Sequence, residues 1–125
     1  MFNLTGCDGV LAVEGTVYEW IDPPINATST IYIDKSIPSG IKIKPLEGAT
    51  INIWDKSGRG DSNMTSDTTG HFSNFDVVAP GVIKYTIEVK HDQFYTVSND
   101  FLSPTKRDAA STHHNVNILM VRKAS

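Results

Sequence analysis

The residues of this 125-residue chain that are best suited to metal binding or nucleophilic chemistry are its four histidines and its single cysteine. The histidines are His71, His91, His113 and His114. The last two are adjacent, so in a regular strand their side chains face opposite ways and cannot both hold one ion. A G-x-S-x-G nucleophile elbow does not occur in the sequence. We therefore expect no catalytic residue, no bound metal and no cofactor.

The cysteine, Cys7, lies in the sequence Leu4-Thr5-Gly6-Cys7, which resembles the bacterial lipobox. In that motif the cysteine is lipidated and becomes the new N-terminus after signal cleavage. A lipoprotein signal also needs an apolar stretch of about 7–15 residues ahead of the site, so this interpretation requires a truncated signal. The alternative is an ordinary free cysteine in a frayed N-terminus. On the first interpretation, residues 1–11 form an N-terminal tail that tethers the protein to a membrane.

The segment from Asp55 to Asn63 is rich in turn-forming residues, which predicts an exposed loop. Its oxygen-bearing side chains recur at every second position, as in a calcium loop, but an arginine interrupts them and no glutamate closes the site. A solvated turn is the better interpretation. The loop also contains Arg59-Gly60-Asp61, flanked by Gly58 and Ser62 as in the integrin-binding loop of fibronectin. It is therefore a candidate adhesion loop, although a turn that happens to contain these residues is the simpler alternative.

Composition excludes some classes of partner. The net charge is −3 and charges of both signs are spread along the chain, so we expect no nucleic-acid partner. The sequence has no apolar run near the roughly 18 residues that would be needed to span a bilayer. Contact with a membrane is therefore expected only through the possible lipid anchor at Cys7.

The elements that would position these residues are short strands. Apolar and polar residues alternate in the clearest of them, and glycine, proline and asparagine separate one strand from the next. One helical turn is predicted from Ser103 to Ala110, because Pro104 suits a first helical position. The pattern predicts a single antiparallel β-sandwich domain over residues 12–125. The predicted strands are 11–20, 30–33, 41–44, 49–54, 65–78 with an interruption near Gly70, 85–90, 94–97 and 115–122.

Four short motifs give the chain a resemblance to the carboxypeptidase regulatory-like domain. They are Gly15-Thr16-Val17, Pro45-Leu46-Glu47-Gly48-Ala49-Thr50-Ile51, Ser66-Asp67-Thr68-Thr69-Gly70-His71-Phe72, and Pro80-Gly81 ahead of Tyr85-Thr86-Ile87. The resemblance implies a transthyretin-like (prealbumin-like) Greek-key sandwich of about seven strands. It also implies a non-catalytic module of secreted or cell-envelope proteins.

The chain departs from the family pattern by a long insertion at about residues 21–44. Long loops on a rigid sandwich are frequent binding sites. Large aromatic residues could also form a carbohydrate platform, although such residues are more often core. These are Tyr18, Trp20, Tyr32 and Trp54.

We therefore expect a structural, accessory or partner-binding module of the cell envelope or the extracellular space, consistent with a bacterial lipoprotein. Its partner would be a protein or a carbohydrate at the cell surface. The first alternative is an adhesive, carbohydrate-binding or ligand-binding domain that uses the 21–44 insertion or the Arg59-Gly60-Asp61 loop. The second is a small transthyretin-like hydrolase.

Overall fold

The computed structural model describes residues 9–55, 62–78, 81–105 and 111–124. Within this part of the chain there are nine strands and no helix. The strands are β1 (Gly9–Trp20), β2 (Thr30–Ile33), β3 (Ile43–Pro45), β4 (Thr50–Asp55), β5 (Ser62–Thr65), β6 (His71–Val78), β7 (Gly81–His91), β8 (Phe94–Thr105) and β9 (Ser111–Met120).

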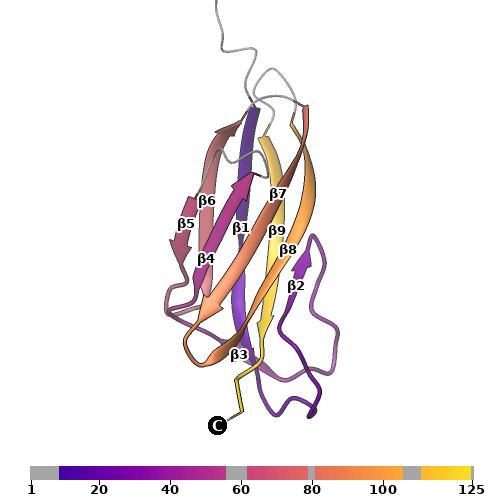
Figure 1. The fold of residues 1–125 in the computed structure, drawn as a ribbon, viewed down its shortest axis with the longest axis vertical. Helices are drawn as coiled ribbons and strands as arrows, with labels where there is room; N and C mark the ends of the chain where they lie inside the picture. Colours follow the sequence, from indigo (N-terminus) through magenta and orange to yellow (C-terminus); the bar gives the residue numbers. More distant parts are fainter. Residues whose placement is uncertain (1–8, 56–61, 79–80, 106–110, 125) are drawn as a thin grey trace, which may run out of the picture.

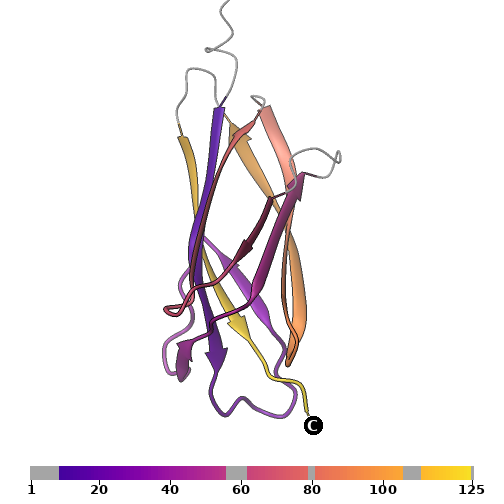
Figure 2. The same ribbon diagram turned by 90° about the vertical axis from the view of Figure 1, so that its left-hand side faces the viewer.

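The described strands form two sheets that face each other (Figures 1 and 2). One sheet has the order β2-β9-β1-β3, and β6 also pairs with β1. Its β1–β9 pair is parallel, whereas its other pairs are antiparallel. The second sheet has the order β5-β4-β7-β8 and is antiparallel throughout. The predicted all-β sandwich is therefore confirmed.

The core lies between the sheets and follows the alternation of apolar residues. In β4, Ile51 and Ile53 are buried, while Asn52 and Trp54 between and beyond them are partly exposed. Successive strand residues point to opposite faces, so one face of each strand enters the core. The same period buries one set of side chains in several strands: Leu11, Val13 and Val17 of β1, Tyr85, Ile87 and Val89 of β7, and Val116, Ile118 and Met120 of β9.

One edge of β1 changes partner at Val17. Before it, Gly9 to Thr16 pair with β6, and after it, Tyr18 to Trp20 pair with β3. The Val17 amide donates to the carbonyl of Gly70, and the Val17 carbonyl accepts from the amide of Leu46, at 2.8 and 2.9 Å. The motifs around Leu46 and Gly70 therefore meet at one residue of the first strand.

The segment that joins β5 to β6 corrects one prediction. Residues 65–78 were expected to form one interrupted strand, but β5 ends at Thr65 in one sheet and β6 begins at His71 in the other. The chain crosses between the sheets in the intervening turn. Within it, the Asp67 carboxylate accepts from the amides of Thr69 and His71, and Gly70 has a φ of +79°. This side-chain cap turns the chain instead of continuing the strand.

Two short strands fall in or near the segment expected to be an insertion. Strand β2 lies inside residues 21–44, and β3 begins within them and ends one residue beyond. The predicted helical turn from Ser103 is wrong at its start, because β8 continues to Thr105 in register with β7, and residues 106–110 lie outside the described ranges. Strand β1 begins at Gly9, so residues 9–11 belong to the sandwich and not to the predicted 1–11 tail.

Candidate functional site

The residues that the sequence singled out for anchoring and adhesion are not among those described. Cys7 lies in 1–8, and Arg59, Gly60 and Asp61 lie in 56–61. Their proposed roles therefore stay predictions.

The histidines are dispersed over the described structure. His113 is exposed and its neighbour His114 is buried, as expected for adjacent residues of one strand. His71 lies 3.7 Å from the exposed Glu14 carboxylate, while the His91 ring makes an edge-to-face contact with the Phe94 ring. Within the described residues there is no group of three or more His, Cys, Asp or Glu side chains that could hold a metal ion.

The candidate aromatic platform is divided between the two outer faces of the sandwich. Tyr18 and Trp20 lie on β1 and Tyr32 lies on β2, in the same sheet, and each alternates with core-facing residues. Trp54 lies on β4 of the other sheet, where it follows the buried Ile53. The four side chains therefore cannot form one continuous surface for a carbohydrate, and that prediction is wrong for the set as a whole.

The insertion contacts the sandwich through Asp34, the residue that follows the end of β2. Its carboxylate lies 2.8 Å from Nδ1 of His114 and accepts a 2.9 Å hydrogen bond from the amide of Asn115. Partial burial raises the pKa of Asp34, but the His114 hydrogen bond, the Asn115 amide and the charge of His114 outweigh it and hold the pKa below 3.8. Asp34 has a φ of +57°, a conformation that aspartate tolerates better than most residues. This contact holds the insertion on β9.

The first part of the insertion forms one wall of a groove at the end of the sandwich. The groove has a volume of about 490 Å³, and we call it the insertion groove. It is lined by Pro23, Pro24, Ile25, Asn26, Ala27 and Thr28 from the insertion, and by Tyr95, Val121, Arg122 and Ala124. Three segments far apart in the sequence therefore build it.

The floor of the groove is held by hydrogen bonds from the backbone of Val121 and Lys123. The amide of Val121 donates to the buried hydroxyl of Ser29 at 2.8 Å, and the carbonyl of Val121 accepts from the amide of Tyr95 at 2.9 Å. The amide of Lys123 then donates to the carbonyl of Gln93 at 2.9 Å. The chain after β9 is thus fixed between the insertion and the start of β8.

Two large apolar side chains are exposed at the groove. Ile25 is 98% exposed at a turn closed by a 2.9 Å hydrogen bond from the amide of Ala27 to the carbonyl of Pro24. Tyr95 is 44% exposed at the start of β8. Tyrosine is enriched where protein partners bind, and the burial of either side chain would release water from a large apolar area.

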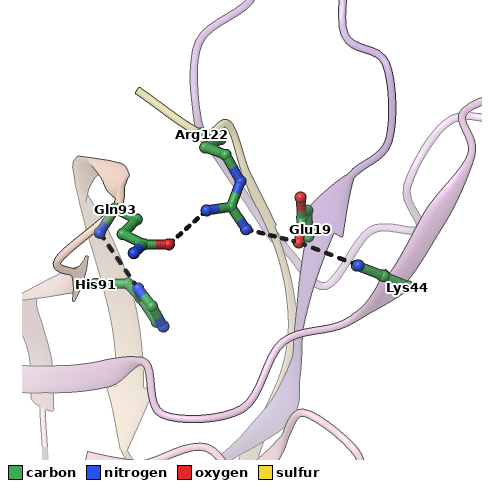
Figure 3. Close-up of polar contacts among 5 residues, drawn as sticks. All are labelled: Glu19, Lys44, His91, Gln93 and Arg122. Carbon is green, nitrogen blue, oxygen red and sulfur yellow. Dashed lines mark hydrogen bonds and ion pairs between the residues drawn. The ribbon is translucent and has the colours of Figure 1, made fainter. Parts of the chain in front are cut away.

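A polar cluster borders the groove at Arg122 (Figure 3). The guanidinium of Arg122 donates to Oε1 of Gln93 at 2.5 Å and to Oε1 of Glu19 at 3.4 Å. Its carbon lies 4.6 Å from the centre of the buried Phe94 ring, which is a cation–π arrangement. On the other side of Glu19, Nζ of Lys44 lies 3.7 Å from the same carboxylate oxygen. Glu19 is therefore one carboxylate between two cations.

The lining of the groove combines apolar and hydrogen-bonding groups. Its described residues include no histidine, cysteine, aspartate or glutamate, the groups that most often act as acids, bases or nucleophiles. Asn26, Thr28, Tyr95 and Arg122 supply hydrogen-bonding groups beside the apolar ones.

Sequence reasoning identified the insertion but not the groove. Ile25 after two prolines, in an otherwise polar stretch, was the available signal that an apolar side chain is presented on a turn. Tyr95 and Arg122 carried no such signal, because their positions beside the insertion depend on long-range backbone pairing.

Among the described residues, no helix is long and apolar enough to cross a membrane. Neither a family model nor a curated protein sequence matches the chain. Among solved structures, the chain is similar to 3-chlorocatechol 1,2-dioxygenase from Rhodococcus opacus 1CP, with a TM-score of 0.56 and 8% sequence identity. The match covers 91% of this chain and 60% of the dioxygenase chain, so the protein corresponds to only part of that enzyme. At this identity the similarity shows the fold alone.

Proposed function

We propose that this protein is a non-catalytic partner-binding module of the carboxypeptidase regulatory-like type, and that it binds a protein partner in the insertion groove. The observation that carries the proposal is the exposure of Ile25 and Tyr95 at a groove whose floor is fixed by Val121. A fixed floor reduces the conformational entropy lost on binding, so more of the gain from burying the two side chains appears as affinity.

A protein partner is favoured over a carbohydrate by the residues present. Exposed isoleucine and tyrosine next to an arginine resemble the centre of a protein interface, where tyrosine and arginine contribute most of the binding energy. A carbohydrate platform would need several aromatic side chains on one face. Tyr18, Trp20 and Tyr32 do share an outer face of one sheet, but none of them lines the insertion groove.

The test is a selection from random-sequence peptides displayed on phage, with the full chain as bait. Peptides are selected on the wild type and counter-selected on the double variant Ile25→Ser/Tyr95→Ser. We expect recovered peptides to bind the wild type and the control variant Lys84→Ser, which changes an exposed residue outside the groove lining. Equal binding of every recovered peptide to the double variant would refute the proposal.

We also propose that the module acts at the cell envelope or outside the cell, with Cys7 as a lipid anchor. The support is the lipobox-like sequence that ends at this cysteine. Expression of the gene with its upstream codons in a bacterial host, followed by membrane fractionation and mass spectrometry, tests it. A lipidated N-terminal Cys7 in the membrane fraction supports the anchor, and a free thiol in the soluble fraction contradicts it.

A further inference from the structure

Arg122 belongs to both the insertion groove and the polar cluster. It lines the groove, and its side chain is 49% exposed. The hydrogen bond to Gln93 and the cation–π contact with Phe94 hold the guanidinium in place. Arginine has five N–H donors in a fixed fork, and the bonds to Gln93 and Glu19 use one donor on each terminal nitrogen. Donors therefore remain on a group whose orientation is already set.

The positive charge of Arg122 is only partly neutralised by its neighbours. Glu19 faces both Arg122 and Lys44, so this trio carries one net positive charge. The Glu19 side chain is only 14% exposed, and its oxygen lies 3.4 Å from the Arg122 nitrogen, which is long for a charge-assisted hydrogen bond. The exposed charges beyond this trio are of both signs, with Lys123 next to Arg122, Asp22 next to Pro23 and Asp92 next to Gln93. The positive charge available to an incoming anion is therefore that of the trio, of which Arg122 lines the groove.

We infer that the partner segment is an extended peptide that presents a carboxylate side chain to Arg122 beside apolar side chains that cover Ile25 and Tyr95. This inference rests on the proposed function and adds the chemistry of its partner. A carboxylate matches the planar fork of arginine with two parallel hydrogen bonds. An extended chain can in addition hydrogen-bond to Asn26 and Thr28, which line the insertion wall.

The test uses the peptides recovered by the selection described above. Each peptide is synthesised in two forms, one with its acidic residue and one with the corresponding amide, Asp→Asn or Glu→Gln. We expect the amide analogue to bind the wild type about tenfold more weakly, the usual cost of losing one charge-assisted contact. Arg122→Gln is expected to weaken binding of the acidic peptide by a similar factor. In this variant the acidic peptide and its amide analogue should bind with equal affinity. Such coupling in a double-mutant cycle assigns the contact to this residue pair.

Two further variants separate a forked contact from general charge and from loss of folding. Arg122→Lys keeps the charge but not the fork, so it should recover only part of the preference for the acidic peptide. Glu19→Gln removes the competing carboxylate, so it should bind the acidic peptide more tightly than the wild type does, an effect opposite in sign to simple structural damage. Affinity for the acidic peptide should also fall as salt is added.

The outcomes distinguish this inference from the proposed function. If the recovered peptides need Ile25 and Tyr95 but bind equally well as acid and as amide, the carboxylate contact is wrong. The proposal that a peptide binds in the groove would still stand. Recovery of no peptide that discriminates the double variant overturns both. Polygalacturonate serves as a second probe, and tight binding of this acidic polysaccharide with no peptide recovered would also overturn the inference.

Discussion

Gly15 of β1 lies directly beside Val116 of the parallel strand β9, and a β-carbon on Gly15 would stand 1.8 Å from the Val116 carbonyl oxygen. The obstacle is backbone, so side-chain rearrangement cannot relieve it. We expect Gly15→Ala to lower the free energy of unfolding by about 3 kcal/mol or more, by forcing the two central strands apart. Urea denaturation followed by circular dichroism measures this change.

The matched control for that substitution is Gly40→Ala. Gly40 has a φ of +88° but nothing lies within 4 Å of the added β-carbon, so only the conformational cost of roughly 1–2 kcal/mol applies. If Gly15→Ala cost no more than Gly40→Ala, the close approach of β1 and β9 would be wrong.

Ser66→Ala should destabilise the joint between the two sheets. The buried Ser66 hydroxyl accepts from the amide of Ala49 at 3.0 Å and donates to the carbonyl of Leu46 at 2.8 Å. Alanine removes both bonds and leaves buried polar groups without this partner, at a cost of about 1–3 kcal/mol. Urea denaturation measures it, with the exposed Thr68→Ala in the next turn as control. Equal midpoints for the two variants would contradict the bridging role.

The parts of the fold that follow local alternation were predictable from the sequence. Isoleucines at 51 and 53 and the run Tyr85, Ile87, Val89 alternate with polar residues, and all five side chains are buried. Two-residue periodicity requires only the geometry of one strand and an apolar core. The end of the first strand near Trp20 was also predictable, because Pro23 and Pro24 cannot donate hydrogen bonds to a strand ladder.

The parts that depend on distant residues were not predictable. The crossing between sheets at Ser66–Gly70 depends on the meeting of Val17, Leu46 and Gly70, and sequence spacing does not reveal such a contact. The groove likewise depends on Ser29 reaching Val121, 92 residues along the chain. A buried serine in a loop has no periodicity to distinguish it from an exposed one.

The Asp34 carboxylate should make stability depend on pH in the acid range. Its pKa in the folded protein is held below 3.8, so the unfolded chain takes up the proton first as the pH falls. The stabilising contribution is therefore complete at pH values well above 3.8 and is lost as the pH falls through the lower, folded-state pKa.

Denaturation of the wild type and Asp34→Asn between pH 3 and pH 7 measures this effect. We expect the wild type to be the more stable at neutral pH and the difference to shrink below about pH 4. A difference that stays constant over the whole range would show that the Asp34 charge does not contribute to folding.

Ser29→Ala should loosen the floor of the insertion groove. The Ser29 hydroxyl and the Val121 amide are both buried, and their 2.8 Å hydrogen bond joins the insertion to the segment after β9. Without the hydroxyl, the amide loses a buried partner, which costs about 1–3 kcal/mol, and its local opening becomes easier. We expect the Val121 amide to exchange with solvent faster relative to the amides of β4 and β7, as measured by hydrogen-exchange NMR.

The control is Thr30→Ala, which removes an exposed 3.2 Å hydrogen bond to the Thr28 carbonyl and should leave the exchange rate of the Val121 amide unchanged. If the Val121 amide exchanges at the same rate in the two variants, Ser29 does not fix the floor of the groove. The argument that a fixed floor favours partner binding would then be wrong.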